Sequence, residues 1–493
     1  MTNIRKSLII SFAERYLLII LKLISFIVLA RLLTPEDIGL VSVSVAFIGL
    51  AHIVRDFGVG SYLIQEKDLT SERKRTSFTI TLIIGVSLFF VLQLLSPYIA
   101  DFYSDQRMQY VIQVLSFNFL LIPFNSVTLA LLRREMKFSI MFAINISAAI
   151  VGTASAVTLA ALDVGYMSLV WSSIASTATT CLGGLIYRKN EFWMRPTLKD
   201  WRRIFNFGSQ ATAANIITEI SMNANDLIVG RVLGFAPVAI ISRAQGVMYL
   251  FQRDIMSAIR NVAYPGFAKA YREKTDLEGI YIRTISAITA IAWPFYALLS
   301  LYSLEFLRIL FGPQWDAASP LVPVFCLAGA IAAMWNLHPQ VLMAMGRIDL
   351  STKAVVTVQL VRLASIITCA IFFDTLMPFA VAFLVAFIIS SFIHEHFKSK
   401  ALKTNWRMKV DGLYRSGLLT FITLSGPVLL KILNVTGTIT LNMYFTVSIS
   451  CIVAAISWLI GLQITKHSII NDPIFPQKLK TVLEYKWRSP STH

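Results

Sequence analysis

Residues 205–231 read FNFGSQATAANIITEISMNANDLIVGR, a stretch long enough to cross a bilayer as one helix. Its middle carries Asn215, Glu219, Asn223 and Asp226. Their spacings of four, four and three place them on one face of the helix. Because amides and carboxylates do not face lipid, this face looks into a protein interior or a water-filled cavity. We interpret it as functional; the alternative is packing against other helices through hydrogen bonds.

Similar apolar stretches recur along the 493-residue chain and decide its class. The chain is 56% hydrophobic and 14% charged, whereas about a quarter of the residues of a soluble domain are charged. Fourteen stretches of suitable length follow one another: 8–30, 38–64, 76–96, 108–132, 138–161, 166–187, 204–229, 236–262, 279–300, 319–344, 354–373, 376–393, 413–433 and 439–464. The sequence therefore predicts an all-α polytopic membrane protein with about fourteen transmembrane helices.

The net charge of +17 is distributed unevenly between alternate loops. One set of loops and termini holds 30 Lys and Arg, and the opposite set holds four. Basic residues collect in cytoplasmic loops, so both termini are expected in the cytoplasm. This pattern accounts for the excess of cations without a nucleic-acid partner.

The sequence contains no motif for a cofactor, a metal or ATP hydrolysis. The four cysteines lie in apolar stretches without paired spacing, and no GxxxxGK[ST] occurs. The external loops are too short for a catalytic domain. His394 and His396 flank Glu395 at the end of a span, and we expect these three residues to form a solvated cap rather than a metal site. No enzyme activity is therefore expected.

The order of features repeats between the two halves of the chain. Residues 31–40, RLLTPEDIGL, align with residues 231–240, RVLGFAPVAI, and the fourth helix of each half ends at an arginine, in ALLRREMKF and MAMGRIDL. A parallel repeat of two pseudo-symmetric six-helix lobes follows. The predicted domains are an N-terminal lobe at 1–203, a C-terminal lobe at 204–400, two additional transmembrane helices at 401–465 and a basic cytoplasmic tail at 466–493.

Cations inside the spans indicate an anionic substrate. Each costs about 2.5 to 3.5 kcal/mol at a helix centre and should therefore lie in an aqueous cavity. Arg and Lys suit a diphosphate, which Arg holds through two hydrogen bonds. For Arg15, the alternative of snorkelling to the membrane surface is weighed equally with substrate binding. For Arg55, the alternative is a structural ion pair with Asp56. The candidate substrate-binding cations are Arg15, Lys22, Arg55, Arg253 and Arg362.

Several motifs together resemble a known family. They are ARLLTPEDIGLVSVSVAFIGLAHIVRDFGVGSYLIQEKDLT at 30–70, LLRREMKF at 131–138, and NANDLIVGRVLG at 223–234 followed by SRA. The chain resembles, over about residues 1–400, the polysaccharide transporter family of the multidrug/oligosaccharidyl-lipid/polysaccharide flippase superfamily, near its Wzx-like colanic-acid-exporter branch. That family often has Gly-x-Tyr before its Ser-Arg-Ala, where this chain has Ala239, Ile240 and Ile241.

The resemblance implies a flippase of the bacterial inner membrane. Its substrate would be an undecaprenyl-diphosphate-linked oligosaccharide repeat unit, moved outward for the synthesis of exopolysaccharide, capsule or lipopolysaccharide. A polysaccharide polymerase and assembly proteins would be its partners. The sequence leaves the glycan and the oligomeric state open, and a monomer is compatible with it.

A flippase without an ATPase motif needs another energy source, and an ion gradient across the membrane is one. Glu219 and Asp226 could take up a proton or a sodium ion in the cavity, with Asn215 and Asn223 lining it. For Asp226 the alternative is a salt bridge with Arg231 or Arg31. Glu219 is therefore the preferred coupling residue.

Three other functions compete with a flippase. A drug/cation antiporter of the same superfamily is disfavoured because cavity cations would repel its substrate. An oligosaccharide polymerase or ligase would need a large external loop. The third candidate, a non-transporting scaffold of the polysaccharide assembly machinery, is left open by the sequence.

Overall fold

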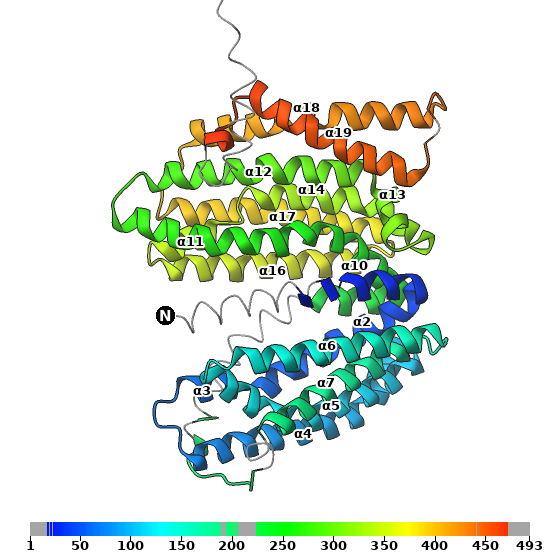
Figure 1. Ribbon diagram of the computed structural model, residues 1–493, viewed down its shortest axis with the longest axis vertical. Helices are drawn as coiled ribbons and strands as arrows, with labels where there is room; N and C mark the ends of the chain where they lie inside the picture. The colour runs from blue at the N-terminus through cyan, green and yellow to red at the C-terminus, as the bar shows by residue number, and fades with distance from the viewer. Residues whose placement is uncertain are drawn as a thin grey trace, which may run out of the picture. The chain divides into compact units, whose positions relative to one another are not determined.

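The computed structural model describes residues 17–18, 20–21, 23–188, 194–202, 204–205, 223–439 and 441–471, and over these residues it is helical without a strand (Figure 1). Eleven of the described helices are long and apolar enough to cross a membrane. The predicted class, an all-α polytopic membrane protein, is confirmed.

The count of fourteen spans is not confirmed. Predicted spans 8–30 and 204–229 lie largely outside the described residues, although an apolar helix is present at Leu23–Leu32. A third predicted span, 236–262, is also absent from the eleven: it is helical, but it carries several charges and is interrupted by a π-helical turn. These three spans remain predictions.

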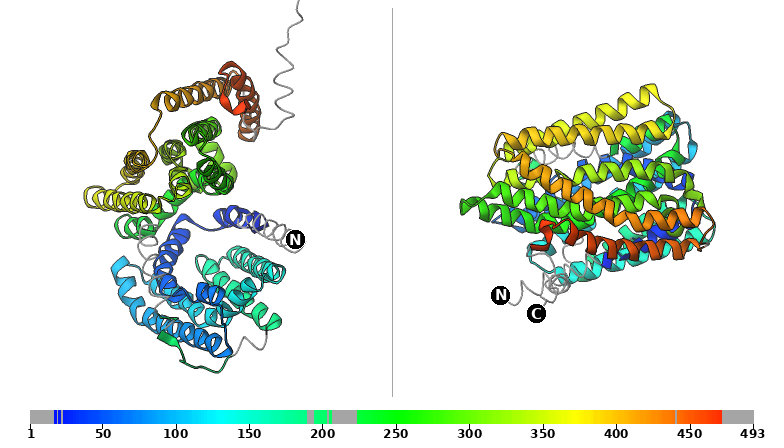
Figure 2. Two further views of the ribbon diagram at one scale, coloured as in Figure 1. Left: turned by 90° about the vertical axis from the view of Figure 1, so that its left-hand side faces the viewer. Right: turned by 90° about the horizontal axis from the view of Figure 1, so that it is seen from above.

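The chain divides into two compact units, Met1–Ala239 and Ile240–His493. In unit 1, α4 packs against α5, and α7 packs against both α5 and α6. Figure 2 shows the helices of this unit lying side by side. Its helices are α2 (Pro35–Asp56), α3 (Val59–Gln65), α4 (Ser71–Tyr103), α5 (Gln106–Arg134), α6 (Phe138–Ala161) and α7 (Met167–Tyr187).

Unit 2 is organised around α12, which packs against α14 and α18; α16 pairs with α17, and α18 with α19. The first helix, α10 (Phe235–Tyr249), begins in unit 1. The others are η1 (Leu250–Ile255), α11 (Met256–Arg272), α12 (Leu277–Leu301), α13 (Ser303–Leu310), η2 (Pro313–Leu321), α14 (Val322–Ala333), α15 (His338–Ala344), α16 (Ile348–Phe372), α17 (Leu376–Ser399), α18 (Trp406–Val435), α19 (Met443–Ile464) and η3 (Ser468–Asn471).

The TPED sequence starts α2. The side chain of Thr34 accepts a hydrogen bond from the backbone N–H of Asp37, and the Asp37 carboxylate accepts one from the backbone of Thr34. This reciprocal capping box satisfies two N–H groups that the first helical turn leaves unpaired. Pro35 fits the first helical position because its missing N–H is not needed there.

The next residues of the same motif fix α2 against the start of α10. A Glu36 carboxylate oxygen accepts a 3.0 Å hydrogen bond from the backbone N–H of Ala236. At Gly39 the backbones approach so closely that a Cβ atom would stand 1.8 Å from the carbonyl oxygen of Phe235. The motif that carries the family resemblance is thus, in part, a packing device of unit 1.

The span that begins with α2 is broken. Phe57 and Gly58 both have left-handed backbones, with φ of 33° and 61°, and α3 begins after them. Arg134, at the end of α5, donates from one guanidinium nitrogen to the carbonyl oxygens of Leu63 and Glu66 at 2.8 and 2.6 Å. The second arginine of the LLRREMKF motif, Arg134, therefore caps the end of α3.

Candidate functional site

The predicted site residues are distributed over both units, and the structure describes only some of them. Asn223 and Asp226 lie on the helical residues 223–232, Arg55 near the end of α2, Arg253 in η1 and Arg362 in α16. Four predicted residues lie outside the described residues: Arg15, Lys22, Asn215 and Glu219.

Arg55 lies in a small polar pocket at the break between α2 and α3. The pocket has a volume of about 200 Å³ and is bounded by α2, α3, α4 and α5. We call it the Arg55 pocket. Its polar lining consists of Arg55, Asp56, Thr81, Asn125, Ser126 and Arg133.

The charge of the Arg55 pocket is only partly balanced. The Arg55 guanidinium lies 2.7 Å from an oxygen of Asp56, whose side chain is 68% exposed, and the buried Nε of Arg55 has no hydrogen-bond partner among the residues that the structure describes. Arg133 adds a second cation to the lining. The pocket therefore suits one phosphoryl or carboxylate group and is too small for a sugar chain.

Asp226 is half-buried and accepts a 3.4 Å hydrogen bond from the neighbouring Asn225. Arg231, considered above as its salt-bridge partner, instead lies with its guanidinium 5.0 Å from the centre of the Phe102 ring. Among the described residues, the structure records no ion pair for this carboxylate. Asp226 is thus a carboxylate without a described counter-ion, as an ion-coupling role requires.

The two predicted cations of unit 2 have different surroundings. Arg253 is exposed on the π-helical turn η1. Arg362 is half-buried in α16, with its guanidinium 4.4 Å from the centre of the Phe387 ring, and its Nε lacks a hydrogen-bond partner within the described part of the chain. The aromatic face stabilises the buried charge of Arg362 without neutralising it, so this cation can still attract an anion.

A chain of polar side chains joins η1 to the turn between α14 and α15. Gln252 donates a 2.9 Å hydrogen bond to the carbonyl oxygen of Gly329 and accepts one from Asn336. Arg260 donates to Asn336 at 3.2 Å. These hydrogen bonds connect η1 and α11 to the turn between α14 and α15, where the span Pro313–Ala344 also departs from a regular α-helix.

The predicted solvated cap at His394, Glu395 and His396 is wrong for two of its three members. His394 is 3% exposed, and the Glu395 side chain is 13% exposed and lies 2.5 Å from Lys409; only His396 is exposed. The prediction failed because the covering groups come from other helices: α12 and α15, which are distant in sequence, and α18, which folds back onto the end of α17.

We call this region the ionic cluster: Glu278, His338, Glu395, Lys398 and Lys409. Lys398 is completely buried and lies 3.0 Å from Glu278 and 3.7 Å from Glu395. Sequence reasoning assigned the two lysines to a cytoplasmic loop. No signal in a single sequence distinguishes them from solvated loop cations.

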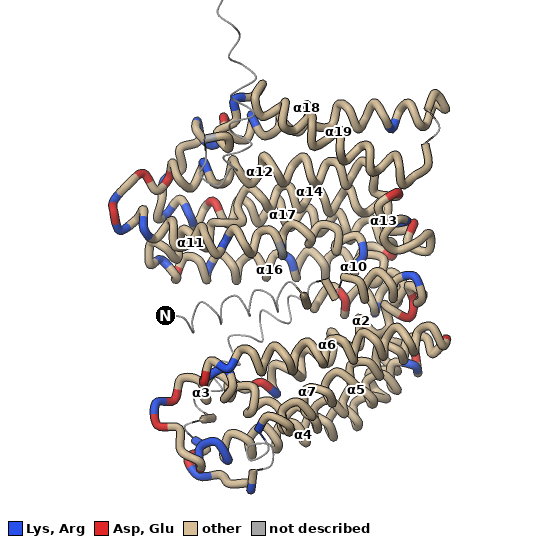
Figure 3. The backbone as a smooth tube through the Cα atoms, viewed as in Figure 1, with Lys and Arg blue, Asp and Glu red and all other residues tan. Residues whose placement is uncertain are grey.

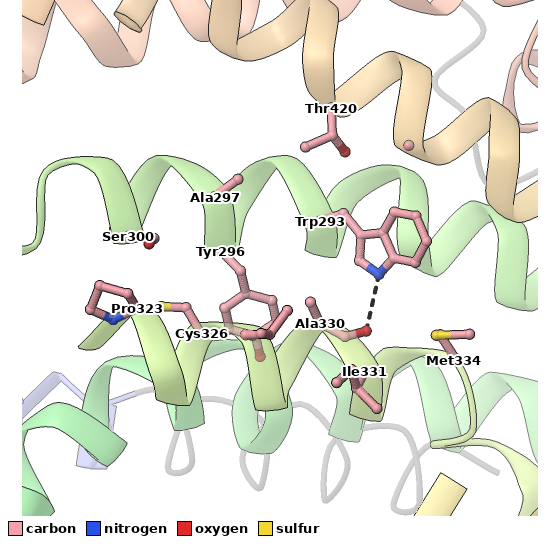
Figure 4. A pocket seen from close by; sticks show the side chains of 12 residues that line it. Trp293, Tyr296, Ala297, Ser300, Pro323, Cys326, Ala330, Ile331, Met334 and Thr420 are labelled. Carbon is pink, nitrogen blue, oxygen red and sulfur yellow. Dashed lines mark hydrogen bonds between the residues drawn. The ribbon is translucent and has the colours of Figure 1, made fainter. Parts of the chain in front are cut away.

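Unit 2 also contains an apolar cavity of about 590 Å³ between α12, α14 and α18. Figure 4 shows Trp293 and Tyr296 beside it, with the Trp293 indole donating a 3.0 Å hydrogen bond to the carbonyl oxygen of Ala330. Pro323, Cys326 and Ile331 complete much of its wall. Such a lining suits hydrocarbon rather than sugar.

Within each unit the charged residues gather mainly at helix ends, with long uncharged stretches between them (Figure 3). The few charges inside spans, described above, are therefore exceptions to the pattern. An ionisable residue at such a place is a candidate functional residue until packing accounts for it.

Comparison with solved structures identifies the fold as that of membrane flippases and transporters. The lipid II flippase MurJ, in an inward closed conformation, matches with a TM-score of 0.70 and 14% identity, covering 93% of this chain and 98% of that chain. An inward-facing multidrug resistance MATE family transporter of the MOP superfamily matches with a TM-score of 0.57 and 16% identity, covering 78% and 95%.

The chain belongs to the family described as polysaccharide biosynthesis protein, whose profile matches residues 28–320. The lipopolysaccharide biosynthesis protein WzxC of Escherichia coli (strain K12) is 27% identical over 338 residues, 68% of either chain. The teichuronic acid biosynthesis protein TuaB of Bacillus subtilis (strain 168) is 24% identical over 336 residues, 67% of this chain and 69% of TuaB. The succinoglycan biosynthesis transport protein ExoT of Rhizobium meliloti (strain 1021) is 24% identical over 319 residues, 63% of either chain.

Proposed function

We propose that this protein is a flippase that moves lipid-linked oligosaccharide repeat units from the cytoplasmic to the periplasmic leaflet of a bacterial inner membrane. The product would enter exopolysaccharide, capsule or lipopolysaccharide synthesis. The observation that carries the proposal is membership of the polysaccharide biosynthesis family together with eleven membrane-spanning helices. The names of WzxC, TuaB and ExoT, all polysaccharide biosynthesis or transport proteins, support it.

We assign the anionic headgroup of the substrate to the cations inside the spans. The Arg55 pocket has the size of a single phosphoryl group, and Arg253 and Arg362 supply positive charge in unit 2. Arg15 and Lys22 complete the set by their positions in the sequence. The substrate class we propose is an undecaprenyl-diphosphate-linked oligosaccharide, whose hydrocarbon chain suits apolar walls like those of the unit 2 cavity.

Glu219 and Asp226 are the proposed coupling carboxylates, for a proton or a sodium ion, and Asn215 and Asn223 are proposed to line the same cavity. A carboxylate that is neutral on one side of the membrane and charged on the other biases the two conformations differently. The described environment of Asp226, with no recorded ion pair, is consistent with such a role. The proposal also includes alternating access between lobes at 1–203 and 204–400, followed by helices at 401–465 and a tail at 466–493.

Both termini are proposed to lie in the cytoplasm because of the loop charges. Cysteine labelling tests the orientation: Cys placed at Ser71 or Asn190 should be inaccessible from outside intact cells. A polysaccharide polymerase and other assembly proteins are the proposed partners, and nothing in the proposal requires a cofactor.

A drug/cation antiporter is the second candidate, because a multidrug transporter shares the fold. The unbalanced cations at Arg55 and Arg362 disfavour a cationic substrate.

The deciding experiment uses the full chain in proteoliposomes that contain a fluorescent lipid-linked oligosaccharide. Outward movement that depends on the chain is expected, whereas a cationic dye should not move. Accumulation of the lipid-linked repeat unit in a deletion strain would support the same conclusion in cells. If the chain moved no lipid-linked oligosaccharide although the deletion strain still lost polysaccharide export, the proposal would be overturned in favour of a scaffold.

A further inference from the structure

His338 occupies an unusual place in unit 2. It is the first residue of α15, directly after the turn that ends α14, and its side chain is 1% exposed. Charged or polar groups from three other helices surround it: Tyr281 of α12, Glu395 of α17 and Lys409 of α18. A buried imidazole needs a specific partner for each ring nitrogen.

Both ring nitrogens of His338 face hydrogen-bond acceptors. Nδ1 lies 2.6 Å from the carbonyl oxygen of Trp335, and Nε2 lies 3.2 Å from a carboxylate oxygen of Glu395. A carbonyl oxygen and a carboxylate oxygen accept hydrogen bonds and donate none. A neutral imidazole carries only one N–H, so it would leave one of these two acceptors opposite a nitrogen lone pair.

Tyr281 does not remove this conflict. Its hydroxyl oxygen lies 3.4 Å from Nδ1 and 3.3 Å from Nε2 of His338. An oxygen almost equally far from both nitrogens lies away from the in-plane lone-pair direction of each. The phenol therefore packs against the ring as a neighbour and is not aligned to donate to one nitrogen.

The other contacts of Glu395 show where the extra proton belongs. Thr404 donates to one carboxylate oxygen, and Lys409 lies 2.5 Å from the other, the oxygen that faces His338. Lys398 lies 3.7 Å from the carboxylate. Donors on both oxygens are the environment of an ionised carboxylate. The additional proton therefore resides on the imidazole rather than on Glu395.

A second buried histidine of unit 2 provides a contrast. His467 Nδ1 accepts a hydrogen bond from the backbone N–H of Ile469 at 3.3 Å. Its Nε2 lies 3.1 Å from the hydroxyl of Ser416, whose oxygen can accept a hydrogen bond from an N–H at Nε2. One nitrogen thus faces a donor and the other an acceptor, so a neutral ring satisfies both. His467 needs no second proton.

We propose that His338 and Glu395 form a buried proton-binding site, in which His338 is an imidazolium ion that donates to Trp335 and to Glu395. The proton is the ligand of this site. The inference does not depend on which substrate the protein moves. If α15 shifts away from α17, His338 loses its acceptor at Glu395 and the reason to hold the second proton disappears. Conformational change at this helix break would then be linked to proton release.

The surrounding charges oppose the second proton, so the two hydrogen-bond acceptors must hold it: with His338 neutral, the ionic cluster is balanced at two positive and two negative groups. With His338 protonated, the ionic cluster has three positive groups and two negative ones, and the ammonium group of Lys398 lies 5.0 Å from the centre of the Tyr281 ring, whose face favours a cation. His394 stacks on Trp335 at 4.3 Å between ring centres.

Helices α11 and α16 also pack against α15. Arg260 of α11 is bonded to Asn336, and Arg362 of α16 lies over the Phe387 ring. Both are held by partners of their own. The carboxylate that His338 contacts directly is that of Glu395.

The test is nitrogen NMR of the full chain in lipid nanodiscs, with ¹⁵N-labelled histidine. The chain has six histidines, and at pH 8 a histidine with the ordinary pKa of about 6.5 is more than about nine-tenths neutral. One histidine is expected to give an imidazolium signal at this pH. That signal should disappear in His338→Gln and change to that of a neutral ring in Glu395→Gln. His467→Gln, the matched control, should remove a neutral signal.

If the signal removed by His338→Gln belongs to a neutral ring, the proposal is wrong. A native spectrum at pH 8 with no imidazolium signal among the six histidines would overturn it without any variant, so the test does not depend on whether the variants fold.

Discussion

The Arg55 pocket of unit 1 and the ionic cluster of unit 2 hold buried cations in opposite ways. Among the described residues, Arg55 is paired with a neighbouring, largely exposed aspartate and keeps a buried nitrogen without a hydrogen-bond partner, and it borders an open pocket. Lys398 is completely buried and bonded to Glu278 and Thr404. A buried cation is thus available to a ligand in the first case and already used by the protein in the second. Burial alone does not distinguish a ligand-binding cation from a structural one. The distinction is whether the protein itself satisfies the hydrogen bonds and the charge of the cation.

The largest effect on stability is expected for Lys398→Met. It leaves Glu278 without its buried counter-charge and removes one of the two lysines beside Glu395, and breaking such a buried pair costs about 3 to 5 kcal/mol. Thermal unfolding in detergent should show a strongly lowered apparent Tm. Lys400→Met, two residues away and exposed, is the control and should leave the Tm nearly unchanged. Equal behaviour of the two variants would mean that the cluster is not a structural unit.

Gly39→Ala should have the next largest effect and involves no charge. The added Cβ meets the carbonyl oxygen of Phe235 at 1.8 Å, so the start of α10 must move, and overpacking of this kind typically costs about 1 to 3 kcal/mol. Gly60→Ala is the control, because no atom lies within 4 Å of its added Cβ. Both variants are compared by thermal unfolding. An unchanged Tm for Gly39→Ala would show that the contact can relax freely.

His467 should make unit 2 sensitive to acid. Burial lowers the pKa of His467 to about 4 from an unfolded value of 6.5, and Arg415 acts in the same direction. The stability that depends on a neutral His467 is therefore present above pH 6.5 and is lost as the pH falls toward 4, by on the order of 1 to 3 kcal/mol. Apparent Tm should be measured from pH 7.5 to 4. Relative to the native chain, His467→Gln should lose less Tm over this range; parallel curves would contradict the assignment.

Arg55→Gln should have the smallest effect on folding and a large effect on transport. Its ion pair with the exposed Asp56 contributes less than about 1 kcal/mol to stability. Loss of a charged contact to the headgroup costs about 1.5 to 3 kcal/mol, or roughly ten- to over a hundredfold in affinity. Flipping in proteoliposomes and Tm are measured together, with Lys137→Gln, an exposed cation of unit 1, as control. A large fall in Tm without a change in flipping would place Arg55 with Lys398 as a structural cation.

The positions of eleven spans were predictable from the sequence because a membrane demands long apolar helices. The predicted span 38–64 corresponds to Pro35–Gln65, for example, and 439–464 to Met443–Ile464. The break at Phe57 and Gly58 was not predictable from hydropathy, because hydropathy carries no information on a left-handed backbone. The ionic cluster was missed for another reason: Glu278 and Lys398 are 120 residues apart, and a single sequence contains no record of which distant charges meet.

The π-helical turn at Leu250–Ile255 also bears on how the sequence evolved. A π turn holds one residue more than the α-helical turn it replaces, so it is the structural form of a single-residue insertion in a continuous helix. Everything after such an insertion is rotated by about 100° about the helix axis relative to an uninterrupted helix. Arg260 follows the π turn, so the rotation directs its side chain toward Asn336, to which it donates a hydrogen bond. An alignment of relatives should therefore show one-residue gaps at this turn, and the relatives with the gap should carry a different residue at the position facing the end of α14.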